Sequence, residues 1–139
     1  MEWNLKAPVS GYQFQVLINQ KSISFSKVQN LVMEQEYEQV QEGGTNDRVL
    51  LFRAPKAQAD VLRLERGVWS GEAPKLVPGQ RLRNLTIMVL RNRLPVKIYA
   101  IDAGVVKSVT VSDLDALNGE VLIETMEILH TGMVPVKVI

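Results

Sequence analysis

Cysteine is absent from this sequence, and histidine occurs once, at His130. Without thiols the chain has no disulfide bridge, no thiolate nucleophile and no cysteine-rich zinc site. A single imidazole cannot supply the paired histidines of a zinc hydrolase motif, so any metal would depend on carboxylates alone. His130 is therefore interpreted as a structural residue at a strand end, and neither catalytic residues, a metal nor a cofactor is predicted.

A large excess of charge is also missing, because the 139 residues carry a formal net charge of +1. A weak field argues against general nucleic-acid binding. No apolar run has the roughly 20 residues of a membrane-spanning helix. Residues 1–11 lack the basic start and apolar core of a signal peptide. We therefore expect no membrane anchor, and a protein assembled in the cytoplasm that leaves it only within something larger.

Apolar residues are plentiful, at 46% of the chain against 22% charged residues. This balance is typical of an ordered globular protein and not of a disordered tail. The length suits one folding unit and is too short for two independent cores. We predict a single domain over residues 1–139.

Apolar and polar residues mostly alternate, which is typical of strands with two different faces. The alternation runs through residues 12–18, continues at Ile23 and Phe25 after a polar turn at residues 19–22, and returns at residues 31–39. The sequence therefore predicts a β protein. The residues of the first strand that share a face are Tyr12, Phe14, Val16 and Ile18.

The clearest strand covers residues 85–90, and the polar pair Asn92-Arg93 then reverses the chain into residues 95–101. Two strands joined by such a pair predict a hairpin. A further strand is predicted over residues 105–111. Its expected common face is made by Val105, Lys107, Val109 and Val111.

Residues 56–68 fit either a helix or a strand, and we favour a strand from Val61 onwards. The last long strand is predicted at residues 120–129. It carries apolar residues on both faces, which indicates burial on both sides.

One short helix is predicted at about residues 112–118. Ser112 is placed to cap it, and Asp115 stands three residues later, as in a capping box. Asn118-Gly119 is a typical helix end. Leu114 and Leu117 would then face the core.

A long loop is predicted at about residues 42–55, because it opens on the turn-forming run Gly43-Gly44-Thr45-Asn46-Asp47. Its second half is unusually apolar, from Val49 through Leu50 and Leu51 to Phe52. An exposed apolar run marks either a partner surface or a strand that the pattern hides. Both interpretations stay open. The partner surface, as a contact between subunits, is the interpretation that gives this run a function.

The order of these features resembles the tail-tube protein family of contractile phage tails and injection systems. The run from Val111 to Gly132 resembles the family's ending, a short capped helix followed by a strand that closes on a histidine and a glycine. Residues 12–16 and 25–28 resemble its first two strands, and residues 42–46 the glycine-rich start of its long loop. Together these matches span nearly the whole chain.

The resemblance implies an antiparallel β-sandwich or barrel with one small helix, assembled as six-subunit rings that stack head to tail into a tube. It implies contacts with a contractile sheath, with baseplate and tube-terminating proteins, and with cargo effectors or DNA in the lumen. The particle would be a phage tail or a phage-tail-like device that can be released from the cell. The contact loop between subunits or rings would use Gly43, Gly44, Asn46, Val49, Leu50, Leu51 and Phe52.

Three alternatives to a main tube subunit remain. The segment Phe52-Arg53-Ala54-Pro55 departs from the turn expected in the family, which suits a tube-initiating subunit near the baseplate. A second alternative is a secreted ring carrier like the haemolysin-coregulated protein of type six secretion. A third is a small carboxylate-dependent hydrolase that uses Asp113 and Glu124.

Overall fold

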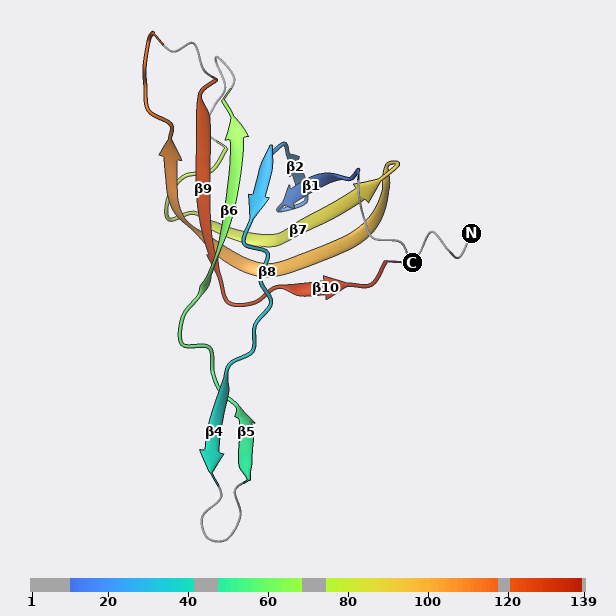
Figure 1. Ribbon diagram of the computed structural model, residues 1–139. Helices are drawn as coiled ribbons and strands as arrows, with labels where there is room; N and C mark the ends of the chain where they lie inside the picture. Colours follow the sequence, from blue (N-terminus) through green and yellow to red (C-terminus); the bar gives the residue numbers. More distant parts are fainter. Residues whose placement is uncertain (1–10, 42–47, 69–74, 118–120, 139) are drawn as a thin grey trace.

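The computed structural model describes residues 11–41, 48–68, 75–117 and 121–138 (Figure 1). Within these residues it contains ten strands, and every strand pair is antiparallel. The predicted antiparallel β architecture is confirmed. The strands are β1 (Gln13–Ile18), β2 (Lys21–Ile23), β3 (Lys27–Gln29), β4 (Tyr37–Gln41), β5 (Val49–Arg53), β6 (Asp60–Gly67), β7 (Arg81–Arg91), β8 (Leu94–Val111), β9 (Ile123–His130) and β10 (Val134–Val136).

Eight strands form one sheet in the order β2-β1-β7-β8-β9-β6-β3, and β10 pairs with β8 outside this path. Figure 1 shows the sheet curling, with β7 and β8 sweeping beneath the upright strands β6 and β9. The remaining strands, β4 and β5, pair only with each other. The molecule is thus a curled sheet with a separate two-stranded extension.

The 18-residue strand β8 belongs to both halves of the curl. Its first part pairs with β7 and β10, and its second part pairs with β9. Gly104 lies between the two parts, where a Cβ atom would stand 2.9 Å from Ile128 Cγ2 and 3.1 Å from the Leu129 carbonyl oxygen. Glycine permits this close approach of β9. The two strands predicted at residues 95–101 and 105–111 are parts of one bent strand, β8.

The register between β8 and β9 shifts between Val106 and Ser108. Such a bulge changes which residues share a face. Val106 is buried, and Val109 packs against the same core, whereas Lys107 is exposed. The predicted common face of Val105, Lys107, Val109 and Val111 is therefore wrong, because period-two alternation does not continue through a bulge.

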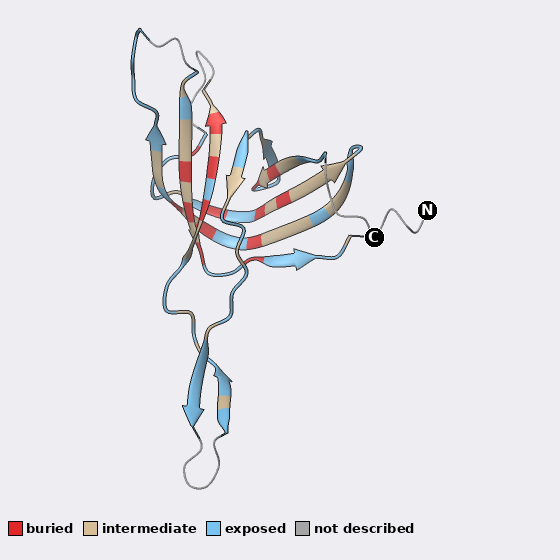
Figure 2. Ribbon diagram, viewed as in Figure 1, coloured by how far each residue is buried: buried red, intermediate tan, exposed pale blue. Residues whose placement is uncertain are grey.

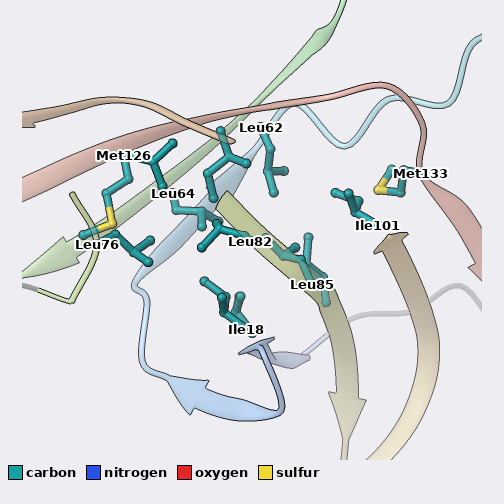
Figure 3. Close-up of a cluster of buried hydrophobic side chains, with 13 residues drawn as sticks. Ile18, Leu62, Leu64, Leu76, Leu82, Leu85, Ile101, Met126 and Met133 are labelled. Atoms are coloured by element: carbon teal, nitrogen blue, oxygen red, sulfur yellow. The ribbon is translucent and has the colours of Figure 1, made fainter. Parts of the chain in front are cut away.

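The hydrophobic core lies inside the curl and receives side chains from both halves of the sheet. Figure 2 shows the buried positions gathered on the central strands, and Figure 3 shows Leu64, Leu82 and Met126 directed into a common space. Side chains from the two halves of the curled sheet thus pack against one another in this core. The buried hydrophobic residues are Val16, Ile18, Leu62, Leu64, Leu76, Leu82, Leu85, Ile87, Ile101, Val106, Met126, Ile128 and Met133.

Two tight turns join neighbouring strands as the sequence predicts. Asn92 and Arg93 have φ values of 52° and 66°, and Asn19 and Gln20 have φ values of 51° and 68°. Two consecutive left-handed residues make a type I′ turn, whose twist matches that of the flanking strands. The predicted β7–β8 hairpin is confirmed, and so is the strand predicted from Val61, since β6 covers it.

The helix predicted at residues 112–118 is wrong for the described residues 112–117, which form no helix, and residue 118 lies outside them. Ser112 instead extends the β8–β9 pairing. Its N–H donates to the Ile123 carbonyl oxygen at 2.9 Å, and its hydroxyl accepts the Ile123 N–H at 3.1 Å. The Asp115 carboxylate accepts the Leu117 N–H at 3.0 Å, which is a local turn. Both side chains thus satisfy backbone groups outside a helix.

Candidate assembly surface

Strands β4 and β5 form an arm that projects away from the curled sheet (Figure 1). Among the described strands, each makes its contacts with the other alone. An isolated two-stranded hairpin is marginally stable in water, because it has no third layer to cover its faces. The described strands therefore leave both faces of the arm uncovered.

The apolar side chains of the arm are divided between two faces by strand alternation. Exposure ranges from 42% for Val40 to 61% for Leu51, and Leu50 is partly buried. Figure 2 shows the arm as almost wholly exposed. The faces consist of Tyr37, Val49 and Leu51 on one side, and Val40, Leu50 and Phe52 on the other.

The contact residues predicted from the sequence are only partly within the described residues. Gly43, Gly44 and Asn46 lie outside them. The rest of that set, residues 49–52, belongs to β5, so the loop predicted at residues 42–55 is a strand over Val49–Arg53. The two interpretations of this apolar run are compatible, since the strand is present and its side chains are also exposed.

The arm root, defined as residues 30–36 and 54–59, connects the arm to the sheet. Its two segments are tied together by hydrogen bonds around Glu36. The Glu36 carbonyl oxygen accepts the Ala54 N–H at 2.9 Å, and its Oε2 accepts the Ala57 N–H at 3.1 Å. Gln35 Nε2 also donates to the Ala54 carbonyl oxygen at 3.3 Å. The sequence pattern contains no signal for these ties.

At the end of the arm root, Lys56 forms an ion pair with Asp60, the first residue of β6. Only 17% and 14% of the two side chains are exposed. Asp60 also stands opposite His130 in the β6–β9 register. The only histidine of the chain is thus brought next to a partly buried ion pair.

His130 is 2% exposed, and its ring nitrogens have no hydrogen bond of standard geometry among the described residues, although the Gly132 backbone lies close enough to favour the charged ring. Burial lowers the pKa of His130, and Asp60 opposes this shift while Lys56 adds to it. The imidazole is therefore neutral at neutral pH. The prediction that His130 lies at a strand end is confirmed, since it closes β9.

The core-facing ladder between β6 and β9 has an apolar centre and charged ends. Leu62 pairs with Ile128, and Leu64 with Met126. At the end far from the arm, the Arg66 side chain meets the Glu124 carboxylate at 3.5 Å. The ion pair with Arg66 therefore gives the Glu124 carboxylate a structural role.

The opposite face of the same ladder carries another ion pair. Arg63 Nη2 donates to Glu127 Oε2 at 2.9 Å, and the Ser108 hydroxyl donates to Glu127 Oε1 at 3.1 Å. These hydrogen bonds, that of Arg63 foremost, lower the pKa of Glu127. Glu127 is thereby fixed as a carboxylate between β6 and β8.

No catalytic arrangement of Asp113 and Glu124 is formed. Asp113 is exposed in the segment after β8, while Glu124 is engaged by Arg66. In the part of the chain that the structure describes, no three His, Asp or Glu side chains are grouped so that they could hold a metal ion. The same residues include no helix with the length and hydropathy to cross a membrane.

The curled antiparallel sheet has relatives among known proteins. The model of the T4-like virus tail tube protein gp19 family matches residues 10–134. The chain belongs to this family. The family consists of structural tube proteins and not of enzymes. Among curated proteins, no sequence matches significantly.

Solved structures share the fold of this tail tube family member over nearly its full length. A chain of an extracellular contractile injection system, the PVC sheath-tube complex in the extended state, has a TM-score of 0.76 at 16% identity, covering 99% of this chain and 97% of the other. A chain of the PVC sheath/tube terminator gives 0.73 at 14% identity, covering 95% and 99%. A chain of the anti-feeding prophage baseplate, 6-fold symmetrised, gives 0.71 at 27% identity, covering 94% and 97%.

Proposed function

We propose that this tail tube family member is a subunit of the inner tube of a contractile injection system, and that it forms six-subunit rings stacked head to tail. The observation that carries the proposal is the arm, whose two apolar faces meet no other described strand. Each of the two apolar faces needs a surface to pack against, and an element inserted between neighbouring subunits would meet two such surfaces. Truncation of apolar anchors at the centre of such contacts typically weakens association most.

The curled sheet supports the same proposal. Its path ends in short strands, β2 and β3, and β10 presents a further edge beside β8. Unpaired edges invite strand pairing, and a closed ring of identical subunits satisfies them. The 6-fold symmetrised baseplate that contains a similar chain is consistent with rings of six.

Partners follow from this role. The similar chains come from a sheath-tube complex, a tube terminator and a baseplate. We expect the same classes of partner here, with effectors or DNA as the contents of the lumen. The tube would be assembled in the bacterial cytoplasm and would leave the cell inside a phage-tail-like particle.

Electron microscopy of the purified protein tests the proposal. Rings or tubes are expected, either from the protein alone or after the other tail components are added. Persistent monomers under both conditions would overturn it. A secreted ring carrier would also form rings, but it would not need sheath or baseplate genes beside its own gene. The presence of such genes would therefore count against this alternative.

A position at the baseplate end of the tube is the second candidate. It is favoured by the 27% identity to the baseplate chain and by the unusual run from Phe52 to Pro55. Quantitative mass spectrometry of intact particles separates the two roles. A main tube subunit is expected at a copy number comparable with that of the sheath, and an initiating subunit at a much lower one.

A further inference from the structure

In the described part of the chain, the arm joins the sheet through its root, because β4 and β5 contact no other described strand. The root segments are tied at Ala54 and Ala57 by Glu36, and Asn30 Nδ2 donates to the Val61 carbonyl oxygen at the start of β6. A change in these few contacts would therefore move the whole arm. A hinge of this kind consists of the residues that end an element.

The Lys56–Asp60 ion pair fixes the last turn of the root. It spans four residues, from the segment that leaves β5 to the first residue of β6. Its two side chains are largely removed from water, so the attraction between them is screened less than that of a surface pair. Breaking a partly buried pair of this kind leaves uncompensated charge behind and is costly.

Beside this pair, the neutral ring of His130 occupies a buried position opposite Asp60. The charged groups around it come from three elements. Lys56 belongs to the root and Asp60 to β6, while Arg81 and Arg83 of β7 line one groove with His130 and the root residue Ala59. Asp60 is the only anion in this set.

We propose that His130, Lys56 and Asp60 form a latch on the arm root, which holds the arm while His130 is neutral and releases it when His130 is protonated. An imidazolium at this position is repelled by Lys56 and attracted by the Asp60 carboxylate, and Arg81 and Arg83 add positive charge to the same groove. It draws Asp60 away from Lys56, and Lys56 then moves out to water. The closed turn of the root opens, and the arm loses its fixed direction.

The sign of the pH effect follows from burial. Because burial lowers the pKa of His130, the latch is closed at and above the ordinary histidine value and opens as the pH falls through the lowered value. If the chain has the proposed function, on which this consequence rests, ring stacking weakens on the acidic side. The movement of the arm in a single subunit does not depend on that function.

Distances between two spin labels measure the arm directly, and the absence of cysteine allows labelling without background. Gln39 on the arm and Thr110 on β8 are exposed and are replaced by cysteine in the full chain. We expect a narrow distance distribution at about pH 8 that broadens at acidic pH, once the pH falls through the lowered pKa of His130. The pH at which it broadens should match the titration of the single histidine signal in the NMR spectrum.

Three variants separate the latch from general acid effects. His130→Gln, which is neutral at every pH, should keep the narrow distribution on acidification. Asp60→Asn, which removes the ion pair, should give the broad distribution at both pH values. Glu127→Gln, which removes a carboxylate on the other face of the ladder, should respond as the unmodified protein does.

The latch is overturned if the distribution does not change with pH while His130 titrates. It is equally overturned if His130→Gln broadens as the unmodified protein does. Should that variant fail to fold, the unmodified protein still decides, since broadening at a pH where His130 does not titrate contradicts the proposal. Failure to form tubes at any pH, with the label response intact, would count against the proposed function and not against the latch.

Discussion

Gly104 shows at the scale of one residue how the curl of the sheet depends on a missing side chain. It allows β9 to approach the bent strand β8 until the space for a Cβ atom is gone. Gly132 is different, because a Cβ atom there would meet nothing within 4 Å. The two glycines form a natural comparison.

Gly104→Ala is predicted to destabilise the isolated subunit by roughly 1–3 kcal/mol, the usual cost of overpacking. The added carbon would lie 2.9 Å from Ile128 Cγ2 and 3.1 Å from the Leu129 carbonyl oxygen. Urea unfolding followed by fluorescence measures the change in the free energy of unfolding. Gly132→Ala is the control and should change it by less than about 0.5 kcal/mol. Equal stability of the two variants would show that β9 does not approach β8 so closely.

At the scale of elements, the sequence predicts those structures whose chemistry is local. Asn92 and Arg93 predict the β7–β8 turn, and alternation predicts the strands beside it. The bulge at Lys107 and the single bent β8 escape prediction, because they depend on register and on the fit of Gly104 against another strand. The capping pattern at Ser112 is misleading, since its hydroxyl and N–H meet Ile123, which is distant in sequence.

The segment after β8 carries two leucines that contribute nothing to the core of the subunit. Leu114 is 84% exposed and Leu117 98% exposed. Replacing both with Ser should change the free energy of unfolding by no more than about 0.5 kcal/mol, as for ordinary surface positions. Leu64→Ala, at a position with no exposure, should cost about 2–5 kcal/mol in the same urea titration. A large loss from the double Ser variant would mean that the leucines pack in the subunit, as a helix there would require.

The arm is the element on which the proposed assembly depends. The double variant Leu50→Ser, Phe52→Ser removes apolar contacts from one face and should abolish or strongly reduce tube formation seen by electron microscopy. The thermal midpoint of the isolated subunit should stay nearly unchanged, because the arm packs against no other described strand. The matched variant Val49→Ser, Leu51→Ser tests the opposite face. A collapse of subunit stability in either variant would contradict the assignment of these residues to a contact between subunits.

The whole molecule combines a well-packed curl with surfaces that a single subunit leaves open. Apart from Leu76 and Met133, the core residues lie in β1, β6, β7, β8 and β9, whereas short strands stand at the edges of the sheet and the arm stands apart. Neither sequence alternation nor the core explains why these edges are unprotected. Under the proposed function, closure with neighbouring copies would explain it, because ring formation would convert each edge into a paired strand.

Amide hydrogen exchange compares the free subunit with the assembled tube at this scale. In the subunit, the amides of β2 and β10 should exchange fast and those at the centre of β7 and β8 slowly, since only the latter lie between two neighbours. On assembly, exchange should slow at the edge strands and in the arm, with little change in the centre. Strand pairing between subunits demands this selective protection. Tubes in which the edge amides still exchange as they do in the free subunit would have to be held together by side chains alone, and the closed circle of strands would then be wrong.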